Sequence, residues 1–594
     1  MNNYSDQLLG WLKELGYTHC FFLAGGNIMH VLESASKLFT CIPVVHEVTA
    51  GIAAEYFNET TNSNGKKAFA LVTAGPGLTN IVTAISGAYL EGRDLLVIGG
   101  QVKSQDLKSR GLRQNGIQEI DGISLVKSIC KTTLQIATPL PGKIVKETIL
   151  EGLRPKKGPV FLEFCLDAQA AQPLLEPIEN TIVVTRSVSK KAIADVMDKV
   201  RESKRPVILI GGGVSRHFMS RNLAALEGLQ IPLMTTWNGT DRIPSNSELY
   251  FGRPNTWGQR SSNILIQQAD LVIAVGTRLG LQQTGFNWES FAPLGDVIQV
   301  ELDEFELNKK SPKLAKKVQM DADDFLSELI KFGPKDDTNE WIEFCLMVRK
   351  IIPLSEEINT VRDGYINTYN FYLGLSMHLN NTDSIVPSSS GASETVAMQA
   401  LNQISGNTVV TTKGLASMGY GLAGAIGCAF ATGARVIHIE GDGGFAQNLQ
   451  DFGTVVANEL PIKTFILCND GYASIRMTQK SYFNGHYLGC DVETGLMLPD
   501  WSTFFMAYGV TPITLDPADP FSPKVLNELR SSGPSVFLVP VDPEQTYFPK
   551  ITSKVVEGGG MQSNPLHFMT PDLPEDIAKN VFKYIGTRGL NEQD

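Results

Sequence analysis

The sequence predicts an α/β protein built from three doubly wound parallel-sheet domains. Short β-branched and apolar runs end in glycine-rich turns, and each run is followed by a stretch with helical periodicity. Strands that alternate with helices form parallel sheets covered on both faces. The order repeats in three blocks, and 594 residues suit roughly three or four domains.

The composition excludes several classes of protein. A hydrophobic content of 43% with 19% charged residues is typical of a globular chain, and the net charge of -11 argues against binding nucleic acid. The eight cysteines form no C-x-x-C pair, so we expect no zinc site, no disulfide framework and a reduced, cytoplasmic setting. No signal peptide and no membrane helix are expected, because no apolar run reaches about 18 residues.

The first domain is placed at residues 1–180. The expected helices are Asp6–Leu15 and Ala50–Asn58, and the expected strands are Cys20–Leu23, Ile42–Val45, Ala68–Val72 and Leu95–Ile98. Glu47 directly follows an apolar run, where an ionised carboxylate is costly to bury. A helix start also accommodates an anion, so a functional acid and a partly exposed glutamate both remain open.

The middle domain is placed at residues 190–335, after a linker over residues 173–187. Its expected strands, Val207–Ile210, Leu271–Val275 and Asp296–Leu302, lead into glycine or acidic turns. The turn Gly211-Gly212-Gly213 departs from G-x-G-x-x-G and is weak evidence for a nucleotide.

The third domain is placed at residues 365–550, after a charge-mixed helical connection over 335–362. The expected strands are Ile385–Ser390, Thr408–Thr412, Ala434–Glu440 and Lys463–Cys468, and one helix is expected over Phe445–Glu459. Residues 551–594 carry Gly558-Gly559-Gly560 and are expected to form a flexible C-terminal arm that folds over the active site.

Two polar residues follow neighbouring strands of this third sheet. Asp442 leaves one expected strand and Asn469 leaves the next, so both reach the sheet edge where open α/β sheets bind ligands. A carboxylate, an amide and the carbonyl of Gly471 suit Mg²⁺ with phosphate oxygens as further ligands. The N–H groups of Gly443 and Gly444, at a helix start, suit a pyrophosphate. The alternative is an ordinary Gly-Asp-Gly turn without a ligand.

Gly-Asp-Gly followed by Asn at the next strand end resembles the metal–diphosphate signature of thiamin diphosphate (ThDP) enzymes. The stretches Gly441–Asp451 and Glu459–Lys463 resemble the acetolactate synthase branch more narrowly. The resemblance implies that Asp442, Asn469 and Gly471 hold Mg²⁺ and that Tyr472 lies beside the cofactor.

The resemblance also implies roles in the first domain. Val45–Gly51 lines up with the segment whose glutamate touches the aminopyrimidine ring, which makes Glu47 the catalytic acid. Gly75–Asn80 resembles Gly-Pro-Gly-x-Thr-Asn, and the remaining residues implied to line the ring or the reacting substrate are Pro76, Asn80, Gly26, Gln101 and Gln118. For the two glutamines, a surface amide is the alternative.

In the third domain, Gly414–Gly421 resembles Gly-Leu-Gly-x-Met-Gly-Phe/Tyr-Gly. Met418 would wedge the cofactor into its bent form, and Ala416, in place of a glycine, would offer a backbone carbonyl. Gly391, Ala392 and Ser393 would touch the cofactor where acetolactate synthases have Gly-Gln-His.

The helix after Asn469 departs from the acetolactate synthases and looks closer to carboligases of bacterial surface-sugar and secondary-metabolite pathways. Ser474, Arg476 and Gln479 add polar groups suited to hydroxyls or a phosphate, and a solvated helix face is the alternative.

The middle domain resembles the acetolactate synthase domain that carries FAD in many members, without using its redox chemistry. The candidate FAD residues are Gly211, Gly212, Gly213, Gly276, Arg278 and Asp303. Pro155-Lys156-Lys157-Gly158 stands where that branch has Gly-Arg-Pro-Gly, and lysine is the poorer phosphate clamp, which counts against FAD.

The expected function is a ThDP- and Mg²⁺-dependent carboligase of acetolactate synthase type, a homodimer or homotetramer. A 2-oxo acid such as pyruvate is the donor, and a second carbonyl, of another 2-oxo acid or a keto-sugar, is the acceptor. The alternatives are a ThDP-dependent decarboxylase or C–C hydrolase, a flavoprotein oxidoreductase, and a catalytically silent regulatory subunit.

Overall fold

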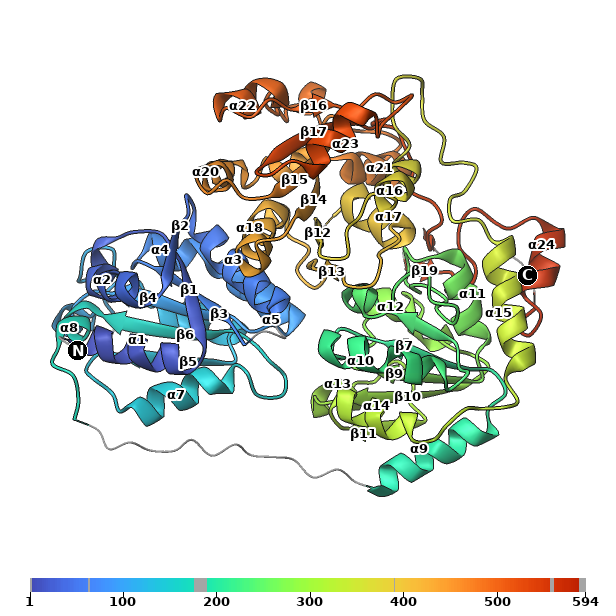
Figure 1. Ribbon diagram of the computed structural model, residues 1–594, viewed down its shortest axis with the longest axis horizontal. Coiled ribbons are helices and arrows are strands. Elements are labelled where there is room, and N and C mark those ends of the chain that lie inside the picture. The colour runs from blue at the N-terminus through green and yellow to red at the C-terminus, as the bar shows by residue number, and fades with distance from the viewer. Residues whose placement is uncertain are drawn as a thin grey trace. The chain divides into compact units, whose positions relative to one another are not determined.

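The computed structural model describes residues 3–61, 65–109, 111–175, 190–388, 390–555 and 560–586. Three parallel sheets carry the fold, and a two-stranded antiparallel sheet lies near the C-terminus (Figure 1). The predicted fold class, three doubly wound α/β domains, is confirmed. Most of the predicted linker, residues 176–189, lies outside the described residues.

The first sheet has six strands in the order β2-β1-β3-β4-β6-β5. The strands are β1 (Tyr17–Phe22), β2 (Thr40–Pro43), β3 (Lys67–Val72), β4 (Leu96–Gln101), β5 (Thr132–Ile136) and β6 (Val160–Cys165). The helices are α1 (Tyr4–Glu14), α2 (Met29–Leu38), α3 (Glu47–Thr60), α4 (Pro76–Asn80), α5 (Val82–Glu91), α6 (Gly122–Val126), α7 (Gly142–Glu151) and α8 (Leu166–Ala170). Phe69 and Leu71 face the core of α1 and α2, whereas Ala68 and Ala70 face that of α3 and α5, because side chains alternate along a strand.

The first sheet changes direction between β1 and β3. The chain runs from β1 to β2 on one side, and α3 then returns it to β3 on the other side. The turns after β1 and β3 touch, because a Cβ on Gly25 would lie 2.4 Å from Cβ of Thr73. Open α/β sheets bind their ligands at such a switch point.

The second sheet has five strands in the order β11-β10-β9-β7-β8. The strands are β7 (Pro206–Ile210), β8 (Leu233–Thr235), β9 (Leu271–Val275), β10 (Asp296–Glu301) and β11 (Lys316–Gln319). The helices are α9 (Lys190–Glu202), α10 (Arg216–Glu227), α11 (Arg260–Gln268), α12 (Leu281–Thr284), α13 (Glu304–Asn308), α14 (Ala322–Ile330) and α15 (Asn339–Ile351). Its switch point lies between β7 and β9.

The third sheet repeats the strand order of the first, as β13-β12-β14-β15-β17-β16. The strands are β12 (Ser384–Pro387), β13 (Thr408–Val409), β14 (Val436–Gly441), β15 (Ile462–Cys468), β16 (Ile513–Thr514) and β17 (Ser535–Pro540). The helices are α16 (Thr368–Ser376), α17 (Ala392–Ala400), α18 (Tyr420–Thr432), α19 (Asp442–Phe445), α20 (Phe452–Ala457), α21 (Ala473–Tyr482), α22 (Trp501–Ala507) and α23 (Pro523–Arg530).

The helix predicted over residues 445–459 is wrong as a single element. The structure divides this stretch into the end of α19, the 3-10 turn η6 (Leu449–Asp451) and α20. Asn448 has a φ of -145°, which no helix contains. The break turns the side chains of Asn448 and Asp451 toward α3, where they make hydrogen bonds.

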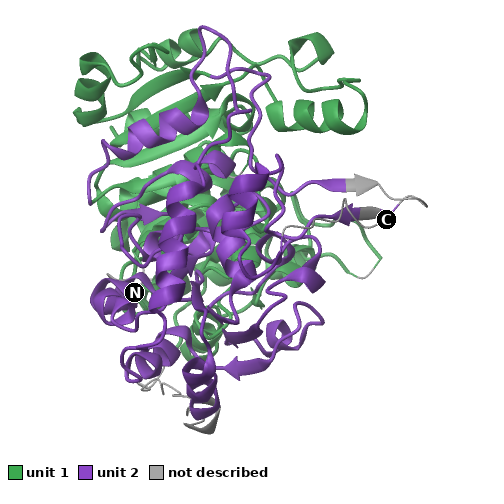
Figure 2. Ribbon diagram, turned by 90° about the vertical axis from the view of Figure 1, so that its right-hand side faces the viewer, with its two compact units in different colours: residues 1–184, 382–393, 410–540 green, residues 185–381, 394–409, 541–594 purple. Residues whose placement is uncertain are grey.

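Two compact units divide the chain, as Figure 2 shows. Unit 1 holds residues 1–184, 382–393 and 410–540, and unit 2 holds residues 185–381, 394–409 and 541–594. Among the described helices, none is long and apolar enough to cross a membrane.

Within unit 1, α3 packs closely against α18, and the two helices lie side by side in Figure 1. Glycines allow this approach, because a Cβ on Gly427 would lie 2.2 Å from the carbonyl oxygen of Ala53. Beside the glycines, the buried Glu55 carboxylate accepts hydrogen bonds from Arg93 at 2.9 Å and from the Tyr420 hydroxyl at 2.8 Å. The helix that begins at Glu47 is therefore fixed to the helix that follows Met418.

The C-terminal segment differs from the flexible arm expected from its glycines. Its described part contains β18 (Ser553–Val555), β19 (Met561–Ser563) and α24 (Glu575–Val581). Leu566, Met569 and Val581 lie in a core shared with α11 and α15. Arg260 donates to the carbonyl oxygens of Met569 and Pro571 at 3.0 and 2.7 Å. Apolar side chains spaced along residues 566–582 therefore make this segment part of the middle domain, and Gly558 and Gly559 lie outside the described residues.

Candidate active site

Glu47 begins α3 and is buried, with 4% of its surface exposed. His46 caps the helix, because its ring nitrogen accepts a hydrogen bond from the N–H of Val48 at 3.2 Å. The side-chain amide of Asn80, at the end of α4, donates to Glu47 Oε2 at 2.9 Å. Among the described residues, no hydrogen-bond donor contacts Glu47 Oε1. The structure thus brings the predicted acid and one predicted ring contact together and leaves one carboxyl oxygen for another partner.

The remaining residues of the first-domain prediction lie at the carboxyl edge of the first sheet. Gly26 is exposed in the turn after β1, and Pro76 starts α4. Gln118 is exposed and packs on Gly75, whose φ is +64°. Gln101 is instead buried, and its amide donates to Glu163 at 3.0 Å and to the carbonyl of Ile120 at 2.7 Å. The side chain of Gln101 is therefore packed inside the first domain and does not line a cleft.

Asp442 directly follows β14 and is buried at the edge of the third sheet. Its Oδ1 accepts from the N–H of Gly443 at 2.7 Å, and its Oδ2 accepts from the N–H groups of Asn469 at 2.9 Å and Gly471 at 3.4 Å. Burial raises the pKa of the Asp442 carboxyl to about 7, although the three N–H donors lower it. The N–H of Gly443 is thus engaged by Asp442, which leaves Gly444 as the glycine of the predicted phosphate cradle.

Three polar groups meet beside Asp442. The amide end of the Asn469 side chain lies 3.1 Å from Asp442 Oδ1 and 2.8 Å from the carbonyl oxygen of Gly471, and it satisfies both acceptors when its nitrogen faces them. With a cation among these groups, the amide would turn its oxygen toward the cation instead. Carboxylate, amide and carbonyl oxygens are the ligands that Mg²⁺ takes. In the described residues, no cluster of three or more His, Cys, Asp or Glu offers another metal site.

The turn after β12 lies at the switch point of the third sheet, next to β14. Ser388 Oγ donates to Glu440 Oε1 at 2.7 Å, which ties the ends of β12 and β14 together. Gly391 has a φ of +65°, and a Cβ there would lie 3.2 Å from Ser474 Oγ on α21. Ser393 is buried and donates to the carbonyl of Ser390 at 2.7 Å. With Ala392 also buried, residues 391–393 of this turn carry only small side chains.

Gln447 lies between Met418, in the loop before α18, and Tyr472, which covers the Asp442 turn. The Tyr472 ring covers Gly443, where a Cβ would lie 2.5 Å from the ring. The amide of Gln447 donates to the Tyr472 hydroxyl at 3.4 Å and approaches the Met418 sulfur at 3.7 Å. Ala416 holds a φ of +53°, which costs a non-glycine residue about 1–2 kcal/mol. A glycine, which the resembling motif carries at this position, would adopt this left-handed backbone without that cost.

Of the three polar residues singled out on α21, Arg476 and Gln479 bind main-chain groups, and Ser474 is half-buried beside Gly391. Arg476 is buried, and its Nη2 donates to the main-chain carbonyl of Asn469 at 2.9 Å. Gln479 holds the following loop, because its amide pairs with the N–H and carbonyl of Leu488, both at 3.0 Å. Arg476 therefore supports the Asn469 turn, a role that its place in the sequence does not reveal.

The middle domain shows no built flavin site at the predicted residues. The N–H groups of Gly211 and Gly213, which would face a phosphate, donate instead to the carbonyls of Val275 and Gly276 at 2.8 and 2.9 Å. The turn after β7 and the turn after β9 approach closely, which explains these glycines. A Cβ on Gly211 would lie 2.1 Å from the carbonyl oxygen of Gly276. The N–H groups of Gly211 and Gly213 therefore serve the contact between these two turns and do not face a phosphate.

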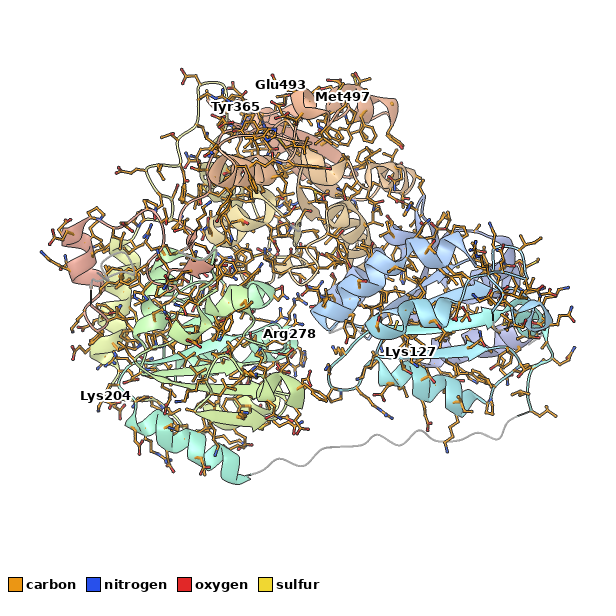
Figure 3. The ribbon with its side chains drawn as sticks, turned by 180° about the vertical axis from the view of Figure 1, so that it is seen from behind. Lys127, Lys204, Arg278, Tyr365, Glu493 and Met497 are labelled. Atoms are coloured by element: carbon orange, nitrogen blue, oxygen red, sulfur yellow. The ribbon has the colours of Figure 1, made fainter. Side chains whose placement is uncertain are left out.

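The other candidate flavin residues also have structural explanations or lie at the surface. Asp303 caps α13 by accepting from the N–H of Phe305 at 3.0 Å. Arg278 is exposed and is labelled in Figure 3.

A buried polar cluster beside Glu47 was missed by sequence reasoning. Asp451 accepts from the N–H of Val45 at 2.8 Å and from the Thr49 hydroxyl at 2.6 Å, and Asn448 donates to Thr49 Oγ1 at 2.7 Å. The available signal was two poor helix formers, Asn448 and Asp451, inside a predicted helix.

Comparisons with known families agree with this arrangement. Residues 2–125 match the thiamine pyrophosphate enzyme N-terminal TPP binding domain, 193–329 the central domain, and 389–539 the C-terminal TPP binding domain. The chain belongs to the thiamine pyrophosphate enzymes. The two TPP-binding matches contain Glu47 and the Asp442–Asn469 pair, which lie at the carboxyl edges of the first and third sheets.

This thiamine pyrophosphate enzyme is similar over most of its length to acetolactate synthases. It is 26% identical to the acetolactate synthase isozyme 1 large subunit of Escherichia coli (strain K12), over 92% of this chain and 95% of that protein. It is 28% identical to a probable acetolactate synthase large subunit of Methanocaldococcus jannaschii, over 84% and 85% of the two chains. It is 25% identical to the chloroplastic acetolactate synthase 2 of Nicotiana tabacum, over 94% and 86%.

Proposed function

We propose that this enzyme is a ThDP- and Mg²⁺-dependent carboligase that decarboxylates a 2-oxo acid, pyruvate foremost, and joins the two-carbon unit to a second carbonyl. The observation that carries the proposal is that the Asp442 carboxylate, the Asn469 amide and the Gly471 carbonyl lie together at one edge of the third sheet. Such a donor set, beside a helix start, suits a hard cation that holds a diphosphate. The similarity to acetolactate synthases over most of the chain supports the reaction class.

The chain's own residues supply binding and proton handling. When bound, ThDP supplies a nucleophilic carbon and a sink for the electron pair that remains when CO₂ departs. Glu47, fixed by Asn80 at one oxygen, would hold a proton at its other oxygen for the pyrimidine ring nitrogen. Asp442, Asn469 and Gly471 would hold the cation, and Met418 would set the bend of the cofactor as an apolar wedge. These assignments follow the residues that the structure gathers at the two sheet edges.

We also propose that two chains share each site in a homodimer or a larger assembly. The support is that Glu47 and Asp442 leave different sheets, each at its carboxyl edge, so a cofactor that uses both must bridge two such edges. A two-fold axis then gives two equivalent sites. Complementation between two inactive variants, described in the Discussion, tests this arrangement.

The acceptor is a second 2-oxo acid or a keto-sugar. The small side chains of Gly391, Ala392 and Ser393, where acetolactate synthases have Gly-Gln-His, favour an acceptor other than the usual 2-oxo acid. The test is mass spectrometry of the products from pyruvate, ThDP and Mg²⁺, with a panel of 2-oxo acids and nucleotide keto-sugars.

A product two carbons larger than one acceptor supports the proposal and names the substrate. Free acetaldehyde or acetate with every acceptor would assign a decarboxylase or hydrolase instead. Absence of ThDP-dependent CO₂ release would refute the proposal.

A further inference from the structure

Asp451 lies in η6, inside the break of the predicted helix, and is fully buried. Burying a carboxylate is costly unless hydrogen bonds compensate for the lost water. Among the described residues, no lysine or arginine forms an ion pair with Asp451, its hydrogen-bond donors are neutral groups, and burial raises the pKa of its carboxyl. The hydrogen bonds that Asp451 accepts must therefore offset this cost.

Both carboxylate oxygens of Asp451 hold the start of α3. Oδ1 accepts from the main-chain N–H of Val45 at 2.8 Å, and Oδ2 accepts from Thr49 Oγ1 at 2.6 Å. Thr49 Oγ1 in turn accepts from the Asn448 amide at 2.7 Å, so its hydroxyl proton is committed to Asp451. Thr454 adds a longer bond to Oδ1 at 3.2 Å.

Glu47 stands midway between the two residues that Asp451 holds. Val45 precedes α3 and Thr49 lies in its first turn, so the two bonds fix the backbone on both sides of Glu47. Asn80 fixes only the carboxyl end of the side chain. The direction in which the helix presents Glu47 therefore depends on Asp451, which follows the Asp442 turn in sequence.

We propose that Asp451 is a positioning residue for Glu47, so that the segment after the metal-binding turn sets the placement of the catalytic acid. This inference rests on the proposed function. It goes beyond it by linking the acid to the diphosphate-binding domain of the same chain. A displacement of about 1 Å at a reacting group can cost about 10²-fold in rate, which makes such a link measurable.

The test compares three variants of the full-length protein with the wild type. Asp451→Ala removes the bonds from Val45, Thr49 and Thr454. Thr49→Val is isosteric and removes the two bonds of the hydroxyl, to Asp451 and from Asn448, but keeps the Val45 bond. The control, Thr454→Ala, removes the longer bond to Asp451 without touching α3. Hydrogen–deuterium exchange of the peptide around residues 44–50 in the cofactor-free protein reports the helix start directly, calorimetry reports ThDP affinity, and NMR reports exchange of the C2 proton of bound ThDP.

We expect Asp451→Ala to slow C2-proton exchange about 10–100-fold, while ThDP affinity changes less than about threefold. Thr49→Val should slow it about 3–10-fold, and Thr454→Ala should match the wild type. Deuterium uptake at residues 44–50 should rise in the first two variants only. If Asp451→Ala does not fold, Thr49→Val carries the test.

A folded variant that lacks the Asp451 contacts but keeps the wild-type C2 exchange rate overturns the inference. Parallel loss of ThDP affinity and exchange overturns it as well, because Asp451 would then serve the diphosphate site or the general fold. A wild-type protein that binds no ThDP overturns the proposed function itself, which separates the two failures.

Discussion

Substitution of Gly427 by alanine is expected to destabilise unit 1, although alanine is the better helix former. Gly427 lies inside α18, and its added Cβ would stand 2.2 Å from the backbone oxygen of Ala53 on α3. Carbon and carbonyl oxygen normally approach to about 3.3 Å, so the two helices must separate by about 1 Å. A backbone oxygen cannot rotate away as a flexible side chain could.

The magnitude of this loss depends on two opposing effects. Overpacking costs about 1–3 kcal/mol, and replacement of a helical glycine by alanine returns about 1 kcal/mol. We expect a net loss of about 1–2 kcal/mol in the free energy of opening α3 and α18. The matched control is Gly453→Ala in α20, where the nearest atom, Cε1 of Tyr508, lies 3.3 Å from the added Cβ.

Native-state hydrogen–deuterium exchange of the α3 and α18 peptides measures this opening free energy helix by helix. The control Gly453→Ala should leave the opening free energy of α3 and α18 unchanged or raise it. The reasoning is refuted if the amides of α3 and α18 are as well protected from exchange in Gly427→Ala as in Gly453→Ala. The close packing of the two helices would then not limit their stability.

Four further outcomes are expected. Glu47→Gln should slow C2-proton exchange of bound ThDP about 10²–10⁴-fold while the fold stays intact; wild-type exchange by NMR would remove Glu47 from the acid role. Asp442→Ala should lose ThDP at micromolar concentration, and Asn469→Ala should lose it more mildly because it removes a neutral ligand; equal affinities by calorimetry would place the metal elsewhere. The Glu47→Gln and Asp442→Ala proteins should each be inactive alone, but a mixture of the two should recover about a quarter of wild-type activity. Half of the randomly formed dimers combine the two variants, and each of these has one intact site of two. An inactive mixture with proven subunit exchange would exclude a shared site. Burial lowers the pKa of His567 from 6.5 to about 4. The unfolded chain therefore takes up the proton first, and the free energy of unfolding falls as the pH falls from about 6.5 toward 4. In urea unfolding between pH 7 and 5, the wild type should lose about 2 kcal/mol more than His567→Gln does.

The strands were predictable because apolar runs ending in glycine carry a strong local signal. The run expected over residues 271–275 is β9 without change, and the run expected over 463–468 is β15 with one residue more. Strand order could not be predicted from these runs, because it depends on which faces the connecting helices cover. The same holds for α3 against α18, whose contact depends on Gly424 and Gly427 meeting a helix far away in the sequence.

The candidate site was predictable where a motif names the residue and unpredictable where tertiary contacts assign the role. Asp442 and Asn469 were expected together because neighbouring parallel strands end at one edge. Arg476 was interpreted either as a group for hydroxyls or a phosphate or as part of a solvated helix face. It instead donates to the Asn469 carbonyl, and nothing in the spacing of α21 indicates that direction. Asp451 lay inside a helical pattern, and only its hydrogen bonds to α3 explain why the helix breaks there.

The contact between Thr49 and Asp451 joins residues 402 positions apart. At about 5–20 residues per second, a ribosome needs about 20–80 s to reach Asp451 after Thr49 has been synthesised. During that time the buried face of α3 has no α18 to pack against, although the middle domain, with cores of its own, can fold in between. The nascent chain therefore carries an exposed apolar helix until the last third of the protein emerges, and such a surface is prone to aggregation during synthesis.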